Sequence, residues 1–353
     1  MMARRSPHIW LPSSPTDTLK PMEGGLEPGV PAASFLFSGD MFVQRIQYHK
    51  YGGPETMKLE AFELETPGPN QVAVQVKFAS LNPIDWKIRQ GALKMMTGRA
   101  FPRTMGSDFS GTIISVGPGV TRFRPGDAVY GLSRLKESGS LGHAVVTQES
   151  YVALKPEALS FEQAACLPTG GVMAWQGLID KAALKAGQHI FVNGCTGTVG
   201  EATVQLARML GVHVSGSCSA ASVNRATEME VYPVYDYGRT SLSSITDRFD
   251  AVYDTVGTGP VSDGLRLLRE DGVLLDINAT PAKFLRSFLN RKLKLFFCTP
   301  RPEILDGIAS AAVDGHINMT VGMTVPLKDA IRLITALEEG RKINGKGLVS
   351  MEG

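Results

Sequence analysis

The sequence predicts an α/β protein with a β-rich first domain and a doubly wound parallel sheet in its second domain. Short segments between residues 42 and 147 alternate apolar and polar residues, most regularly at 71–81, as half-buried strands do. After Leu167-Pro168 the pattern changes to strands alternating with helices. The most specific unit is a strand, a glycine turn, a helix and a second strand at 189–217, which is typical of a βαβ crossover.

The β-rich domain is expected to span residues 41–165 and to be barrel-like, with turns such as Pro125-Gly126-Asp127 between its strands. We place its strands at 42–49, 57–64, 71–81, 110–117, 127–132 and 143–147. The tail contains an expected helix at 327–339 and a final strand at 347–350. We expect this segment, from about residue 310 to 353, to return to the first domain and complete it.

The second domain is expected to span residues 166–309. We place six parallel strands at 189–193, 212–217, 234–235, 249–254, 272–278 and 294–298. Helices are expected after the glycine turn, at about 221–230 and at 260–270. Strands that alternate with helices in this way form a doubly wound sheet, in which ligands bind at the carboxyl ends of the strands.

Composition limits the possible partners. The chain has 353 residues with 43% apolar residues and a net charge of +2, which argues against nucleic acid as the main partner. No apolar run approaches the roughly 20 residues that span a bilayer, so we expect a soluble, cytoplasmic protein. The four cysteines form no C-x-x-C pair, and we expect free thiols even at Cys195 and Cys218, which end adjacent strands.

The first forty residues, Met1 to Asp40, are rich in Pro, Ser and Gly and show no sustained periodicity, so we expect a disordered extension. Arg4 and Arg5 leave an organellar transit peptide open, although the acidic residues in this segment are unusual for one. An upstream start that precedes a true start at Met41 is a further alternative.

The glycine turn predicts a binding site for a dinucleotide pyrophosphate. Gly194 permits a tight turn, Gly197 lets the backbone approach a ligand, and Gly200 allows close packing of helix against strand. The free amides and the dipole at the start of the helix favour an anion there. The expected contacts from the rest of the turn are Thr196, Thr198 and Val199. The alternative is a tight turn that binds nothing.

Several motifs occur in a fixed order along the chain. They read NPIDWKIRQG at 82–91, FPRTMGSDFSGTIISVG at 101–117, FRPGDAVYG at 123–131 and CLPTGGVMAWQGL at 166–178, followed by the glycine turn. From Met41 to the C-terminus the chain therefore resembles the zinc-free quinone oxidoreductase branch of the medium-chain dehydrogenase/reductase superfamily, in particular its plant-type enone and quinone oxidoreductases. The resemblance implies a GroES-like catalytic domain, a Rossmann NADP-binding domain and a homodimer.

Metal ligands of the zinc-dependent relatives have no counterpart in this chain. Those relatives share an early Cys, a Gly-His-Glu motif and a four-cysteine lobe, and the matching places here read Asn82-Pro83-Ile84-Asp85 and Gly106-Ser107-Asp108. Without imidazole or thiolate ligands a tetrahedral zinc site cannot form. We therefore expect no metal.

The end of the second strand of the Rossmann domain predicts the choice of cofactor. An acidic residue there would select NAD, whereas residues 217–221 read Ser-Cys-Ser-Ala-Ala, so NADPH is favoured and Ser219 is an expected contact. Arg225 is the nearest cation, with a solvated helix residue as the alternative. The resemblance also implies that Tyr237 touches the 2′-phosphate. For the nicotinamide end it implies Val256, Gly257 and Asn278. It also implies Asn82 and Asp85 there, which we count with Lys87 as catalytic candidates.

Lys87 is the candidate for stabilising charge on the oxygen of the acceptor. It lies in the segment 82–91, at a place where other quinone reductases have a tyrosine. A general acid there would work best with its pKa lowered toward 7 to 8, and we expect repulsion from Arg89 to contribute to that. The alternatives are a surface lysine that supports the loop, and a lysine that only donates a hydrogen bond while water supplies the proton.

The sequence thus predicts an NADPH-dependent, zinc-independent reductase of α,β-unsaturated carbonyls, quinones or both. The alternative is an NADPH-binding, weakly catalytic, redox-responsive interaction protein, which departures from the family at Met173 and at residues 230–232 keep open. The basic and aromatic segment at 283–294 also suggests membrane attachment. We favour a helix over the substrate cleft or in a dimer contact for that segment.

Overall fold

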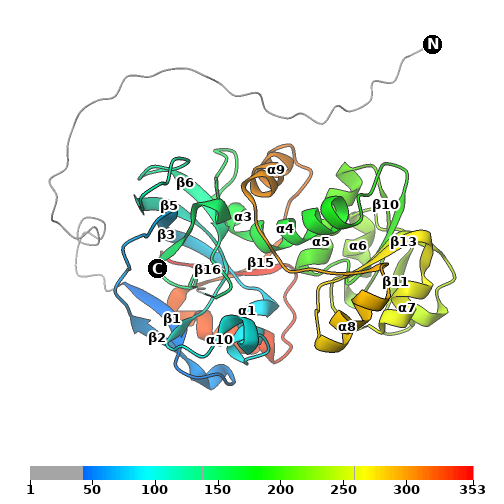
Figure 1. The fold of residues 1–353 in the computed structure, drawn as a ribbon, viewed down its shortest axis with the longest axis horizontal. Coiled ribbons are helices and arrows are strands. Elements are labelled where there is room, and N and C mark those ends of the chain that lie inside the picture. The colour runs from blue at the N-terminus through cyan, green and yellow to red at the C-terminus, as the bar shows by residue number, and fades with distance from the viewer. Residues whose placement is uncertain (1–42, 137–138, 258, 353) are drawn as a thin grey trace, which may run out of the picture.

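The computed structural model describes residues 43–136, 139–257 and 259–352, so the expected disorder of Met1–Asp40 lies outside the described residues. The described strands form three sheets, two in the first domain and one in the second. The two domains lie side by side along the long axis of the molecule, with helices between them (Figure 1). This is the α/β architecture that the sequence predicts: a β-rich domain and a six-stranded parallel sheet of the Rossmann type.

The first domain contains a seven-stranded and a three-stranded sheet. The larger sheet has the order β15-β16-β3-β5-β6-β8, and β7 also pairs with β3; the smaller has the order β2-β1-β4. These strands are β1 (Gln44–Tyr48), β2 (Met57–Ala61), β3 (Gln71–Ser80), β4 (Arg103–Thr104), β5 (Asp108–Val116), β6 (Ala128–Leu132), β7 (Ala144–Gln148), β8 (Val152–Leu154), β15 (Val321–Pro326) and β16 (Lys346–Ser350). The longest, β3, buries Val72, Val74 and Val76, as its alternation predicts.

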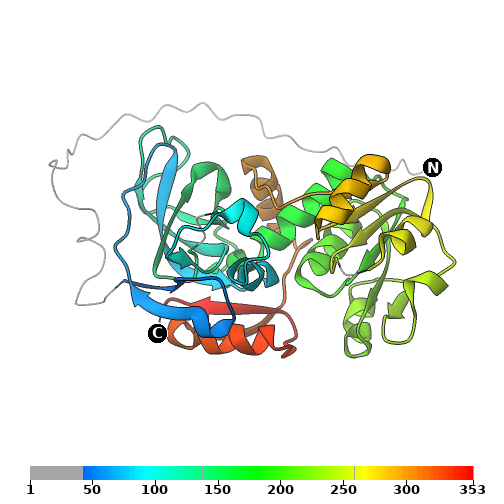
Figure 2. The ribbon, with the colours of Figure 1, turned by 60° about the horizontal axis from the view of Figure 1, so that its bottom comes forward.

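The tail returns to the first domain, as expected. Strand β16 pairs antiparallel with β3 and parallel with β15, so residues 348–350 lie beside residues 78–80 of the first domain. Figure 2 shows this C-terminal unit, in red and orange, packed along the first domain. The exact limits of the two domains, at residues 165 and 310, stay a prediction.

The second domain is a parallel sheet with the order β11-β10-β9-β12-β13-β14. Its strands are β9 (His189–Asn193), β10 (His213–Cys218), β11 (Val234–Asp236), β12 (Phe249–Asp254), β13 (Leu268–Asp276) and β14 (Leu293–Leu295). Ile190 and Val192 belong to one apolar core, whereas Phe191 between them belongs to another. The sheet is therefore covered on both faces, which explains why its strands read as continuous apolar runs.

The helices connect these strands and the two domains. They are α1 (Pro83–Arg89), α2 (Lys94–Thr97), α3 (Phe161–Cys166), α4 (Pro168–Trp175), α5 (Thr198–Met209), α6 (Val223–Glu228), α7 (Val261–Arg266), α8 (Pro281–Leu289), α9 (Pro302–Val313) and α10 (Ala330–Glu338). Helix α3 packs on the first sheet and α4 packs on α5 of the second domain, so the chain passes between the domains near Leu167.

No helix in the described part of the chain is long and apolar enough to cross a bilayer. Cys166, Cys195, Cys218 and Cys298 are all free thiols in this structure, which agrees with the expectation for Cys195 and Cys218.

Candidate active site

A pocket of about 260 Å³ opens at the carboxyl ends of β9, β10, β11 and β12. It is lined by Gly194, Thr196, Gly197, Thr198, Val199, Cys218, Ser219, Tyr237, Thr255 and Val256. Eight of these residues are among the twelve that the sequence analysis assigns to cofactor binding, the exceptions being Cys218 and Thr255. The structure thus brings residues from four strand ends together at one surface.

The glycines of the turn have distinct geometries. Gly194 adopts a φ of +82°, which favours glycine. A Cβ on Gly200 would lie 2.0 Å from the carbonyl oxygen of Gly194, whereas a Cβ on Gly197 would meet only that same oxygen, at 3.4 Å. Gly200 is therefore required for packing of α5 against β9, and the backbone at Gly197 is open to a ligand.

This pocket fits the pyrophosphate of a dinucleotide. Helix α5 begins there, and the first amides of a helix have no partner within it. Its lining contains no carboxylate that would repel a phosphate. Backbone amides, the positive end of the helix dipole and neutral polar side chains together form an anion site.

Arg225, the cation expected near the 2′-phosphate, has other partners in this structure. Its guanidinium lies 2.6 Å from the buried carboxylate of Glu201 and donates to the carbonyl oxygen of Thr196 and to Asn344, each at 3.3 Å. It is not part of the pocket lining, whereas Ser219 and Tyr237 are. A phosphate contact from Arg225 stays a prediction, since it would have to form beside the Glu201 pair.

Gly257 and Asn278 lie in contact at the ends of β12 and β13. The side-chain amide of Asn278 donates to the carbonyl oxygen of Gly257 at 2.8 Å. The backbone amides of Val256 and Gly257 donate to one carboxylate oxygen of Asp254, at 3.2 and 2.9 Å. The turn that is expected to receive the nicotinamide is therefore held from both sides.

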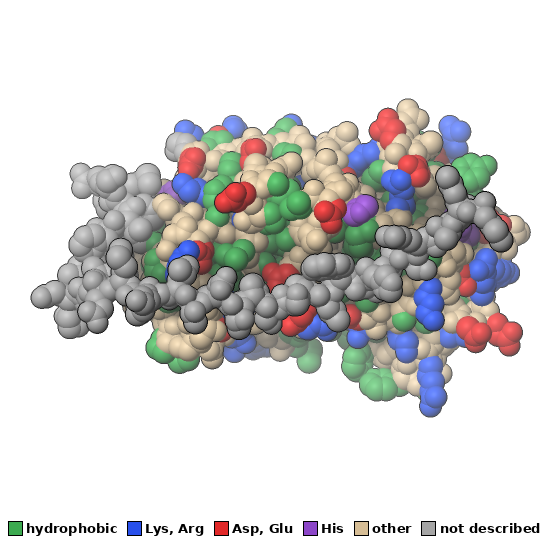
Figure 3. Space-filling model, turned by 90° about the horizontal axis from the view of Figure 1, so that it is seen from above, with side chains coloured by type: hydrophobic (Ala, Val, Ile, Leu, Met, Phe, Trp, Pro, Cys, Tyr) green, Lys and Arg blue, Asp and Glu red, His purple; other side chains and the backbone are tan. Residues whose placement is uncertain are grey.

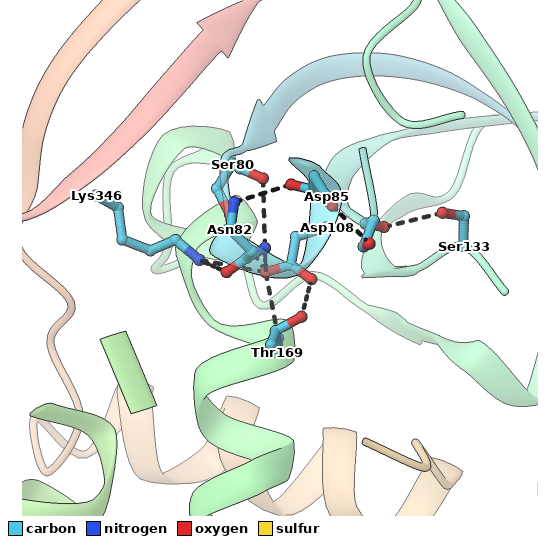
Figure 4. A network of polar contacts seen from close by, with 8 residues as sticks. Ser80, Asn82, Asp85, Asp108, Ser133, Thr169 and Lys346 are labelled. Carbon is cyan, nitrogen blue, oxygen red and sulfur yellow. Dashed lines mark hydrogen bonds and ion pairs between the residues drawn. The ribbon is translucent and has the colours of Figure 1, made fainter. Parts of the chain in front are cut away.

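In the first domain, Asp108 is the centre of a buried polar network (Figure 4). One of its oxygens accepts hydrogen bonds from Asn82 at 3.0 Å and from Lys346 at 3.2 Å. The amide of Thr169, at the start of α4, donates to the same oxygen at 3.2 Å. The network thus joins α1, β5, β16 and the helix that leads into the second domain, with Ser80 as a further donor.

Lys346 and Thr169 were not singled out from the sequence. Lys346 is fully buried, and its ammonium group also donates to the side-chain oxygen of Asn82 at 3.0 Å. A lysine that precedes an apolar strand is a signal for such a partner, because an unpaired ammonium is seldom buried. The identity of the partner depends on the topology of the sheet and is not visible in local sequence.

Asn82 and Asp85, both assigned to catalysis from the sequence, are buried at the start of α1. The carboxylate of Asp85 accepts from the amide of Asn82 at 2.8 Å and from the hydroxyl of Ser107 at 2.9 Å. Burial raises the pKa of Asp85 to about 7, and the nearby Asp108 carboxylate contributes to the rise although the two hydrogen bonds oppose it. Asp85 is therefore expected to titrate close to neutral pH.

This shift predicts a pH dependence of stability. Because the folded pKa of Asp85 lies above the unfolded value, the folded chain holds a proton between about pH 4 and 7 that the unfolded chain has released. Stability is therefore lost as pH rises through this window, by up to about 1.4 kcal/mol per pH unit. Thermal unfolding of wild type and Asp85→Asn from pH 5 to 8 should show wild type falling relative to the variant. A constant difference between the two curves would contradict the shift.

Lys87 lies on the exposed face of α1, outside this network. Its ammonium group forms no hydrogen bond or ion pair with the described residues. The expected repulsion from Arg89 is wrong, because Arg89 is fully buried, forms an ion pair with Glu338 and donates to the carbonyl oxygen of Gly52 at 2.8 Å. Its charge is neutralised on the buried side of the helix.

Two family descriptions match this chain. Residues 68–174 match the alcohol dehydrogenase GroES-like domain, and residues 229–349 match a family described as zinc-binding dehydrogenase. No group of three or more His, Cys, Asp or Glu side chains suited to a metal ion is found in residues 43–136, 139–257 and 259–352.

Curated relatives include plant enzymes. The chain is 31% identical to a chloroplastic quinone-oxidoreductase homolog from Spinacia oleracea, over 70% of this chain and 78% of the relative. It is 31% identical to a chloroplastic NADPH-dependent alkenal/one oxidoreductase from Arabidopsis thaliana, over 67% of this chain and 63% of that protein.

Solved structures show the same fold. A quinone oxidoreductase from Coxiella burnetii superimposes with a TM-score of 0.80 at 27% identity, covering 88% of this chain and all of that one. The Escherichia coli quinone oxidoreductase complexed with NADPH gives a TM-score of 0.74 at 26% identity, covering 87% of this chain and 99% of that one.

Proposed function

We propose that this chain, which belongs to the quinone oxidoreductase branch of the medium-chain dehydrogenase/reductase superfamily, is an NADPH-dependent, zinc-independent reductase of α,β-unsaturated carbonyls, quinones or both. The observation that carries the proposal is the pocket at the glycine turn, whose lining suits the pyrophosphate of a dinucleotide. Relatives named for alkenal/one reduction and for a complex with NADPH support the same activity.

When bound, NADPH would supply the hydride, and the protein would supply position and electrostatics. The glycine turn would hold the pyrophosphate, and the paired turns at Gly257 and Asn278 would form a wall for the nicotinamide. Negative charge that develops on the acceptor oxygen needs a donor. Lys87 is the proposed donor, because its ammonium group is exposed on α1.

Asn82 and Asp85 serve this proposal by holding α1 rather than by reaching an acceptor. Their polar atoms contact Asp108, Ser107 and Lys346, and both residues are buried. They would fix the start of the helix that carries Lys87. Zinc independence is supported by the partner of Asp108. Its carboxylate forms an ion pair with Lys346 and does not act as a metal ligand.

Cofactor preference is proposed as NADPH over NADH. Ser219 and Tyr237 line the pocket, and no acidic residue lies among its lining. A carboxylate at this place would favour a ribose hydroxyl and oppose a phosphate. The hydroxyl of Ser219 lies 3.1 Å from that of Ser222, and because one hydroxyl of this pair donates to the other, the pair keeps one neutral donor at the end of β10.

A second candidate is an NADPH-binding protein with little turnover. Met173, which departs from the family pattern, is 5% exposed and its carbonyl oxygen accepts from the hydroxyl of Tyr253 at 3.0 Å. A methionine in this core offers no hydroxyl to a bound ligand. NADPH binding without oxidation by any acceptor would favour this candidate.

The remaining partners are proposals as well. A homodimer is implied by the family and is tested by light scattering in solution. Acidic and basic side chains are interspersed on the face shown in Figure 3, which supports a small-molecule partner rather than nucleic acid. The proposed location is cytoplasmic, or organellar if Met1–Asp40 acts as a transit peptide; the spinach relative is called chloroplastic.

The test is steady-state oxidation of NADPH and NADH with a panel of enones, a short alkenal and several quinones. We expect turnover with NADPH, and a loss of at least tenfold in kcat for Lys87→Ala, because a positioned acid or donor contributes about 10² to 10⁴ in rate. Lys94→Ala, an exposed lysine on the neighbouring α2, is the control and should retain activity. Full activity in Lys87→Ala would remove the role proposed for that lysine.

A further inference from the structure

Helix α8 exposes its apolar face, which is the reverse of the usual pattern for a surface helix. None of its nine residues is buried, and its large apolar side chains point outward: Phe284, Leu285, Phe288 and Leu289 are each more than half exposed. Burial of an apolar face holds most helices of a domain in place. Contacts at the N-terminal end of α8 must hold it instead.

Lys283 supplies those contacts from the inward face of the helix. Its ammonium group lies 2.5 Å from a carboxylate oxygen of Asp276 and donates to the carbonyl oxygen of Gly257 at 2.9 Å. The side chain of Lys283 is 14% exposed and that of Asp276 is 2% exposed, so the pair is largely shielded from water. A shielded pair of this kind is screened little by salt.

Asn278 also donates hydrogen bonds to Asp276 and Gly257. Its backbone amide donates to Asp276 and its side-chain amide donates to Gly257, both at 2.8 Å. The ends of β12 and β13 and the start of α8 therefore share one set of hydrogen bonds. Val256, the neighbour of Gly257, lines the pocket that begins at the glycine turn.

We propose that Lys283 is a positioning residue for the nicotinamide half of the cofactor: by holding the Gly257 carbonyl and the Asp276 carboxylate together, it fixes the wall that the strand ends present to the ring. This inference rests on the proposed function for the identity of the ligand. Loss of the ammonium group leaves Gly257 with one donor and Asp276 without a cation. The wall then loosens, while the adenosine end at Ser219 and Tyr237 stays unchanged.

The test compares binding of NADPH with binding of 2′,5′-ADP, which carries the adenosine half alone, to the full chain. We expect Lys283→Met to weaken NADPH about tenfold or more, since hydrogen bonds from a charged donor are the stronger ones, and to leave 2′,5′-ADP within twofold. Lys283→Arg should recover part of the loss. Arg286→Met, an exposed cation on the same helix, is the matched control.

The outcomes separate this inference from the proposed function. Unchanged NADPH binding in Lys283→Met, or equal weakening of both ligands, would overturn the positioning role. Wild-type protein that binds NADPH but reduces no acceptor would refute the reductase activity. The dissociation constants of Lys283→Met for NADPH and for 2′,5′-ADP would still decide the role of Lys283. Wild-type protein that does not bind NADPH would overturn both.

Discussion

Lys346→Met is expected to lower the free energy of unfolding by about 3 to 5 kcal/mol, because it leaves the carboxylate of Asp108 buried without its cation. Both partners are fully buried, so water cannot take the place of the ammonium group. Asn82 also loses a donor to its side-chain oxygen. Chemical denaturation at neutral pH measures the loss, and the change in midpoint should appear without a change in slope.

Two further variants make this expectation specific. The double variant Lys346→Met, Asp108→Asn removes the stranded charge and should be more stable than Lys346→Met alone. Lys77→Met removes the partly exposed lysine partner of the exposed Glu352 and should cost less than about 1 kcal/mol. A small effect for Lys346→Met, similar to that for Lys77→Met, would mean that the buried pair contributes little.

The predicted strands agree with the structure where the local pattern is strong. β9 and β12 occupy 189–193 and 249–254, as the sequence predicts. Both lie in the middle of the parallel sheet, where continuous apolar runs are required on account of burial on two faces. The same alternation of strands and helices predicts that the sheet has six parallel strands, but not the order in which they lie.

Other elements depend on contacts that no short stretch of sequence reveals. Helix α4 contains Gly170 and Gly171, which disfavour a helix, but a Cβ on Gly171 would lie 2.9 Å from side-chain atoms of Ile308 on α9. Strand β15 has no buried residue, and the parallel pairing with β16 that forms it is not visible in its own short stretch of sequence. Tertiary packing determines both elements.

In the candidate site, too, some residues are predictable from local sequence whereas others depend on tertiary packing. Pocket residues lie at strand ends within one βαβ unit and its neighbours, where local motifs and the family resemblance predict all but Cys218 and Thr255. The Asp108 network joins residues 238 positions apart, and the interaction of Lys283 with Gly257 depends on how α8 lies on the sheet. Arg89 illustrates the limit: its place beside Lys87 in sequence suggested repulsion, whereas the helix turns it to Glu338 on the buried side.

Gly200→Ala is expected to abolish cofactor binding, because its Cβ would lie 2.0 Å from the carbonyl oxygen of Gly194 and 2.8 Å from the Cα of Cys195, both backbone atoms. Atoms this close must separate, so α5 has to move away from β9 and the amides at its start no longer point into the pocket. Gly197→Ala is the matched variant, since its Cβ meets the nearest atom at 3.4 Å.

The two substitutions should therefore differ in their effects on thermal stability and on NADPH binding. Gly200→Ala should lower the melting temperature, and it should also lower the affinity for NADPH by more than a hundredfold. Gly197→Ala should keep the melting temperature of wild type within a few degrees and weaken NADPH alone, because its methyl group occupies space that the open backbone leaves for the pyrophosphate. Calorimetric titration and thermal unfolding of both variants separate packing from ligand contact. If Gly197→Ala binds NADPH as wild type does, the pyrophosphate does not approach that amide, and the ligand must lie elsewhere along the strand ends.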